Sequence, residues 1–596
     1  MRGPHPRPGP EESTPQVEPA PGLPSRLALV VLVALVVLAP WPYGAAHPRA
    51  VQAVAVIALA IALAAWLFAG RSPRVPFPAW PLAALLGLAL LQIVPLPRAV
   101  LALVAPGPAA VWHPAIPAAA SVLGPGAHPV SVDPDATRRW IAFTTGVVAL
   151  GLVCVPPLRT RRRALAAALA VIAGALLVAL YGVVARTLFG SLLFGTMAVP
   201  TIAPFGSFVS KNHFAGYVEM AALLGAGLTW GLADEARRSK AALSWVGSPR
   251  AGRVVVAAGA TVAIGLSALL AQSRGGAVSL LAGAFVLVAL RLYVRRKTAP
   301  GGRRWFLGAL VLVAVGAGAV AALPPDARAR LGTLAGMDRD NSGQFRLGVW
   351  SDTLRLVARS PLVGHGFGAY ADALPPHKTG RGYVAVEHAE SDVLELVAEA
   401  GLVGLLLATI GLGGAARVVA RGLSQQTDRL RRGLGLGAAA GASALLVHSA
   451  FDFNLRIPSN ALLFVFLCAL GLAAAGTPGD PPSRRPLGAI AVALGLALAI
   501  TTPAAPTSPL PIEARAFAVK GGRPVTPLRV AQATHALTAH LRGRPAHAEA
   551  WLFLAWLQSA AGAQDDAAAL AGHAARLDPQ RAAIASEAAR IQAGPR

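Results

Sequence analysis

The sequence has few charged residues and only 27 acidic ones. Asp, Glu, Lys and Arg make up 13% of its 596 residues, whereas a soluble globular domain normally carries about 25%. In their place, 55% of the residues are hydrophobic and the mean hydropathy is +0.57. This composition excludes an ordinary soluble domain and indicates an integral membrane protein.

Cysteine is almost absent. Cys154 and Cys468 both lie within apolar runs, so neither a disulfide framework nor a cysteine-based metal site is available. There is no HExxH motif, and the histidines that have carboxylates nearby, such as His388 and His448, lie in separate segments. The sequence therefore predicts no metal and no other cofactor.

The 53 Lys and Arg residues give a net charge of +26, which in a soluble protein would suggest nucleic-acid binding. Here much of the excess lies in short loops between apolar runs. The positive-inside rule explains such loops, and no nucleic-acid partner is expected.

Apolar runs of roughly 17–25 residues are long enough to cross a membrane. We count about thirteen of them, which makes the predicted fold an all-α polytopic membrane protein. They lie near residues 27–45, 51–69, 79–96, 139–156, 164–188, 213–233, 254–272, 276–294, 305–323, 393–416, 433–451, 459–476 and 486–503.

Each basic cluster follows an even-numbered run, as Arg161 to Arg163 follow the fourth. The positive-inside rule then predicts a cytoplasmic N-terminus and an outer C-terminus. The polar stretches that look suited to chemistry all fall on the outer side under this topology. They are residues 97–138, 206–217, 272–276, 324–391 and 451–460.

The chain divides into three expected parts. Residues 1–25 are rich in Pro and Glu and are expected to be a disordered cytoplasmic tail. Residues 26–503 form the membrane domain, with 324–391 as its large outer loop. Residues 504–596 begin with a Pro/Thr/Ser linker and continue with a pattern like a tetratricopeptide helix pair around Trp551. One repeat cannot bury a core alone, so this tail is expected to dock on the membrane domain or on a partner protein.

Three basic residues are candidates for binding an anion. Lys211, followed by Asn212 and His213, opens an apolar run, where a helix N-terminus favours negative charge. The alternative is that Lys211 contacts lipid headgroups and His213 caps the helix. Arg274 lies in a tight QSRGG turn between two apolar runs, which favours anion binding. Arg346 has helical spacing to Trp350, a pattern also typical of an amphipathic surface helix.

The loop supplies the candidate acid–base residues. His388 is the natural general base at neutral pH, and Glu390 or Asp392 could fix its tautomer. The alternative is that acidic residues here only complement the dipole of the following helix. A further histidine, His365 in PLVGHGFGAY, is flanked by glycines and more typical of a structural turn.

Together these stretches resemble the O-antigen ligase and O-antigen polymerase superfamily. The resemblance covers roughly residues 190–475. It rests on the order and spacing of six motifs, listed here as they stand in the chain: GSFVSKNHFAGY, SRGG, Arg346 with Trp350, PLVGHGFGAY, HAESDVLELVAEAGLVG and HSAFDFNLRIPSNALL.

The resemblance implies a metal-independent, all-helical membrane glycosyltransferase of the bacterial inner membrane, with its active site facing the periplasm. Its donor would be an undecaprenyl-pyrophosphate-linked glycan. Its acceptor would be lipid A-core, a growing glycan or a protein, and a periplasmic protein could bind the tail. Lys211, Asn212, His213, Arg274, Arg346 and His365 would then bind substrate, and His388, Glu390 and Asp392 would be catalytic.

Two departures from the family pattern bear on these roles. The family often has arginine where this chain has Lys211, and lysine cannot make the bidentate phosphate contact. The family motif often has a second histidine where this chain has Glu390, which makes Glu390 the alternative base.

Two functions of other classes remain open alternatives. A transporter would need polar residues in the middle of several spans and a matched pair of broken helices. The sequence has few such polar residues and indicates no matched pair. A scaffold would use the tail to recruit partners, with the membrane part as its anchor.

Overall fold

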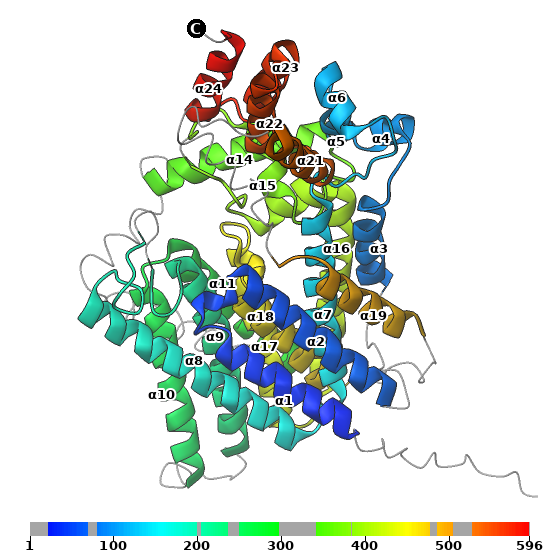
Figure 1. Cartoon of the computed structure of the whole chain (residues 1–596). Coiled ribbons are helices and arrows are strands. Elements are labelled where there is room, and N and C mark those ends of the chain that lie inside the picture. The colour runs from blue at the N-terminus through cyan, green and yellow to red at the C-terminus, as the bar shows by residue number, and fades with distance from the viewer. Residues whose placement is uncertain are drawn as a thin grey trace, which may run out of the picture.

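The computed structural model describes residues 22–68, 80–199, 204–236, 249–296, 341–382, 384–476, 486–504 and 527–594. Within these ranges every regular element is a helix (Figure 1). Seven of these helices contain a stretch long and apolar enough to cross a membrane. They are α2 (Pro48–Phe68), α7 (Pro134–Leu158), α8 (Arg161–Phe189), α10 (Pro249–Leu270), α11 (Arg274–Arg296), α16 (Asp392–Gln425) and α18 (Pro458–Ala475). The chain is a polytopic, all-helical membrane protein, as predicted.

Helices also lie at the other predicted spans that fall within the described ranges. They are α1 (Leu23–Leu38), α3 (Trp80–Gln92), α9 (Lys211–Ala236), α17 (Arg429–His448) and α19 (Pro486–Thr501). The predicted span 305–323, most of the predicted N-terminal tail and most of the linker after 504 lie outside the described residues. The number of crossings and their orientation stay predictions.

Helices α9 and α17 pack closely because glycines face each other across the contact. A Cβ atom added to Gly433 would lie 2.5 Å from the carbonyl oxygen of Gly227, and one added to Gly441 would lie 2.8 Å from that of Met220. Small residues allow membrane helices to approach in this way, where no hydrophobic effect drives them together. The small-residue content of these spans therefore has a packing role.

Helix α16 is broken at Gly401, whose φ and ψ are 66° and −169°. The backbone groups freed by the break are hydrogen-bonded to the loop that follows α14 (Asn341–Arg359). Leu402 N donates to Pro361 O at 2.8 Å, and Gly366 N donates to Glu399 O at 3.0 Å. Irregular backbone is tolerated near a membrane only when its polar groups are paired like this. The glycine-rich PLVGHGFG loop thus supplies the hydrogen-bond partners that the break in α16 requires.

The two ends of the bundle differ in chemistry. At one end, the first turns of α9, α11 and α16 meet the last turn of α17, since Ser273 donates to Asn212 and Asp392 N donates to Ser449 O. The opposite end carries ion pairs that tie helix ends together, such as Arg161–Glu235 at 2.8 Å. The residues suited to chemistry thus share one end.

The C-terminal tail is helical and packs on the rest of the chain at that same end, near α14 and α15 (Tyr370–Ala373) in Figure 1. It consists of α21 (Pro527–Gly543), α22 (Ala548–Ala560), α23 (Gln564–Leu577) and α24 (Ala582–Gln592). Its apolar core, around Leu537 and Trp551, includes Ala119 and Leu123 of α6 (Pro117–Leu123). Its membership of the tetratricopeptide class stays a prediction.

We predict that Gly433→Ala lowers the stability of the α9–α17 contact. The added methyl group has no room beside Gly227, and overpacking of this kind costs about 1–3 kcal/mol. The measurement is the thermal unfolding midpoint in detergent. Gly259→Ala in α10 is the matched control, because a Cβ there meets nothing within 4 Å. Equal midpoints for the two variants would contradict the packing role.

Candidate functional site

Asp452, in the turn between α17 and α18, is the centre of a polar network. Its side chain is 3% exposed. Asn212 Nδ2 donates to Asp452 Oδ2 at 2.6 Å, and His213 Nε2 lies 3.3 Å from Oδ1. Arg346 Nη2, from α14, donates to Oδ2 at 3.3 Å. Burial raises the pKa of Asp452, but His213 and Arg346 outweigh it, so the net pKa is below the ordinary value and the carboxylate is charged.

The first turn of α11 joins this network through Ser273. Its hydroxyl donates to Asn212 Oδ1 at 2.9 Å and accepts from Gly276 N at 3.1 Å, which caps the helix. Arg274 is the first residue of α11 and Lys211 the first residue of α9. The network therefore brings the two helix N-termini together, each starting with a half-buried basic residue.

Glu390 is held by α14. Arg346 Nε donates to Glu390 Oε2 at 3.3 Å, and Trp350 Nε1 donates to Glu390 O at 3.4 Å. The φ angle of Glu390 is 54°, a left-handed backbone conformation that residues other than glycine rarely adopt. Burial and the nearby Asp452 raise the pKa of Glu390, while Arg346 lowers it. The predicted helix carrying Arg346 and Trp350 thus covers the site through these contacts.

His388 is oriented by a carboxylate and an aromatic ring. Its Nδ1 lies 3.0 Å from Glu395 Oε1, and its ring stacks on Phe453 with centroids 4.3 Å apart. Glu395 is itself fixed by Ala389 N at 2.9 Å and Arg456 Nε at 3.1 Å. Burial lowers the pKa of His388, but the Glu395 carboxylate raises it more, so the net pKa is above the ordinary value.

This pairing determines which ring nitrogen can do chemistry. Because Nδ1 of His388 faces Glu395, Nε2 is the ring nitrogen that this pairing leaves free. The side chain retains 31% exposure, compared with 1% for Glu395. We predicted that Glu390 or Asp392 would orient His388; the structure assigns that role to Glu395, one turn further into the helix.

Asp392 bonds to the turn that carries Asp452. Its Oδ2 accepts from Ser449 Oγ at 2.7 Å and from Leu455 N at 2.9 Å. Its own N–H donates to Ser449 O at 2.9 Å. The side chain therefore holds the α17–α18 turn against the start of α16. Its predicted catalytic role stays a prediction.

His365 lies apart from the other predicted residues. It is buried, and its Nδ1 is 3.1 Å from Ala398 O. Val132 N donates to its backbone carbonyl at 3.1 Å, and a Cβ on Gly107 would lie 2.6 Å from its ring. Burial lowers its pKa to about 4. These contacts make His365 part of the loop that packs against the break of α16 at Gly401. Substrate binding by His365 stays a prediction.

A buried histidine–carboxylate pair lies next to the network. His448 Nδ1 is 3.1 Å from Glu219 Oε1, with side chains 1% and 0% exposed. A Cβ on Gly275 would lie 2.9 Å from His448 Nε2, so the ring packs on the first turn of α11. The pair supports the helix end that carries Arg274.

Asp452 and Glu395 belong to the network but are not among the site residues that the sequence motifs predict. The signal for Asp452 was its place in a polar FDFN stretch that follows an apolar run on the predicted outer side. The signal for Glu395 was its position on one helix face with Asp392 and Glu399. Both patterns were visible, but neither shows which side chain meets which.

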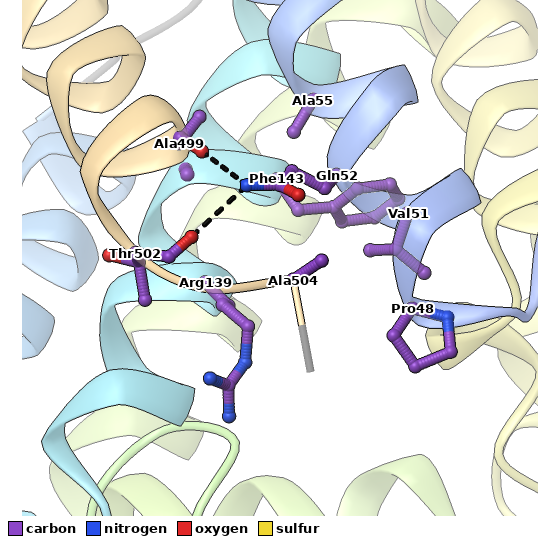
Figure 2. A pocket seen from close by; sticks show the side chains of 10 residues that line it. Pro48, Val51, Gln52, Ala55, Arg139, Phe143, Ala499, Thr502 and Ala504 are labelled. Atoms are coloured by element: carbon purple, nitrogen blue, oxygen red, sulfur yellow. Dashed lines mark hydrogen bonds between the residues drawn. The ribbon is translucent and has the colours of Figure 1, made fainter. Parts of the chain in front are cut away.

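A small pocket lies elsewhere, between α2, α7 and α19 (Figure 2). Gln52 crosses it and donates to Ala499 O at 2.8 Å and to Thr502 O at 3.0 Å, and Arg139 lies at its edge. None of the predicted site residues lines it. Within the described ranges, no group of three or more His, Cys, Asp or Glu residues is arranged to hold a metal ion.

The fold and this site define a helical membrane protein with clustered cations and a histidine–carboxylate pair at one end. Residues 259–409 match the model of the O-antigen ligase family. This match confirms the predicted resemblance to the O-antigen ligase and polymerase superfamily. The matched segment contains Arg274, Arg346, His388 and Glu390, whereas Asp452 lies beyond it. No curated protein matches the chain significantly.

We predict that Glu395→Gln lowers the pKa of His388. The substitution keeps the shape of the side chain but removes the negative charge that raises this pKa. Histidine NMR titration of the labelled protein in detergent is the measurement. His365 is the internal control, because its low pKa comes from burial and should not change. An unchanged His388 titration would contradict the pairing.

Proposed function

We propose that the protein is an O-antigen ligase-like glycosyltransferase at the periplasmic face of the bacterial inner membrane. It would transfer or polymerise a glycan carried by undecaprenyl pyrophosphate. The observation that carries the proposal is the gathering, at one end of the bundle, of the helix starts at Lys211 and Arg274, of Arg346 and of the His388–Glu395 pair. The family match supports the same class of reaction.

The cations suit the donor's leaving group. Breaking the bond between the anomeric carbon and the pyrophosphate places negative charge on the phosphate oxygens, and fixed cations stabilise it. Lys211 and Arg274 begin helices whose N–H groups and dipoles also favour an anion. Arg346 is held in place by Glu390 and Asp452. Such fixed groups could replace a metal ion in this role.

The histidine suits the acceptor. A glycosidic bond forms between the acceptor oxygen and the anomeric carbon, and the hydroxyl proton passes to His388 Nε2. The electron pair of the broken bond leaves with the pyrophosphate. Glu395 stabilises the resulting imidazolium through Nδ1, 3.0 Å away. The acceptor is lipid A-core, a growing glycan or a protein.

Glu390 is the alternative base. Its strained backbone and raised pKa are typical of a functional carboxyl group. Its side chain, however, is bonded to Arg346, which stabilises the charged form and weakens it as a base. The geometry therefore favours His388.

We predict that His388→Ala lowers the rate of transfer by about 10²–10⁴-fold, the usual contribution of a general base. The assay uses purified protein, an undecaprenyl-pyrophosphate oligosaccharide and each acceptor class in turn. Asp566→Asn, on an exposed carboxylate of the tail, is the control. A full rate in His388→Ala with a large loss in Glu390→Gln would assign the base to Glu390. No product on any acceptor would reject the enzyme.

We further predict a shift in the pH profile of Glu395→Gln. The base must be unprotonated, so kcat/KM falls as the pH drops below the pKa of His388. Because Glu395 raises that pKa, its removal should move the acidic limb of the profile to lower pH. The plateau rate should fall as well, because the ring loses its orientation. A limb that does not move would argue against His388 as the base.

A further inference from the structure

Arg544, between α21 and α22 of the tail, reaches two carboxylates outside the tail. Its guanidinium bonds to Asp372 with Nη2–Oδ1 at 2.7 Å and Nε–Oδ2 at 3.2 Å. Its Nε also lies 3.2 Å from Asp133 Oδ2. The three side chains are 18%, 12% and 3% exposed. The contact is therefore a largely buried, two-pronged ion pair rather than a loose surface bridge.

The partners of Arg544 belong to two separate elements. Asp133 caps the N-terminus of α7, and Asp372 lies in α15 of the large loop. Burial and the nearby Asp372 raise the pKa of Asp133 to about 6, against the effect of Arg544. Without this guanidinium, the only ion pair left to either carboxylate among the described residues would be the one between Asp133 and Arg139, whose Nη2 lies 3.7 Å from Asp133 Oδ2. The tail thus reduces the repulsion between Asp372 of the loop and Asp133 at the start of α7.

The tail makes a second contact further along the same loop. Gly382 packs against the turn between α23 and α24, where an added Cβ would collide with the carbonyl of Gln580. The turn leaves no space for any side chain at this position. The tail therefore touches the loop at both Asp372 and Gly382.

The stretch between these two contacts leads to the candidate site. It is bonded to α14, where Asp352 accepts from Thr379 Oγ1 at 2.7 Å and from Arg381 Nη2 at 2.8 Å. The same helix carries Arg346. His388 and Glu390 follow within a few residues, before the chain enters α16.

We propose that the helical tail positions the candidate site, by holding residues 372–382 at Asp372 and Gly382 and so fixing the loop that carries His388 and Glu390. Arg544 is then a positioning residue that never touches substrate. The inference rests on the proposed function only for its activity measurement. Its structural consequence can be tested without any substrate.

The first measurement is hydrogen exchange of the full-length protein in nanodiscs. Arg544→Gln should speed exchange of amides 378–390 about tenfold or more, because a broken buried ion pair loosens its surroundings. Gly382→Val should do the same from the second contact. Exchange in α9 and α17 should not change. Arg590→Ala is the control, since its side chain is 73% exposed on the tail surface.

A charge swap separates the ion pair from other effects of substitution. Arg544→Asp combined with Asp372→Arg keeps one guanidinium among two carboxylates and should restore slow exchange. Unchanged exchange in both Arg544→Gln and Gly382→Val would overturn the proposal. So would faster exchange spread evenly over tail and membrane helices, because that pattern indicates plain destabilisation.

Activity gives the second measurement. With an undecaprenyl-pyrophosphate oligosaccharide as donor, Arg544→Gln should lower kcat about tenfold with little change in donor KM, and the swap should recover it. Full activity in Arg544→Gln alongside loosened exchange would overturn the positioning role. Failure of the wild-type protein to transfer would instead reject the proposed function, and the exchange data would still decide the positioning of the loop.

Discussion

The geometry of the site depends on the free-energy cost of burying a charged group, and Asp452 is the buried carboxylate that imposes this constraint. An ionised carboxylate taken out of water must be paired and hydrogen-bonded, or it will not stay ionised. Asp452 is 3% exposed, and its partners come from α9 and α14, two elements far apart in the chain. Satisfying this one group fixes where Asn212, His213 and Arg346 lie.

The same constraint explains the loop around the site. The break of α16 at Gly401 frees backbone groups that the PLVGHGFG segment satisfies. The chain therefore contacts the middle of α16 before it enters that helix at Asp392. The Asp392 side chain then bonds to the α17–α18 turn and holds it in place. Glycine is needed at position 364 because a side chain there would strike the α16 backbone at Glu399, and at position 366 because a side chain would strike Ser131. Rigid support of this kind is what a transferase needs to keep its charged groups in register.

The arrangement also places two kinds of group at one end of the bundle. Lys211 and Arg274 begin α9 and α11, where the helix N-termini favour negative charge. His388 pairs with Glu395, and Arg456 contacts the same Glu395 carboxylate. Arg346 connects the two because it bonds both Asp452 and Glu390. Arg346 therefore links the Asp452 network to Glu390 and the loop segment that carries His388.

The sequence by itself determined the membrane class, most helix positions and the polar stretches that gather at one end of the molecule. These follow from hydropathy and from the sorting of basic and polar residues along the chain, which are one-dimensional properties. It also supplied His388, Arg274 and Arg346 as candidates. Only the tertiary structure decided that Glu395 orients His388 and that Asp452 is the hub. The tertiary structure also placed His365 apart from the other predicted site residues. Those facts depend on which buried groups satisfy one another across distant segments, and spacing along the chain does not encode that choice.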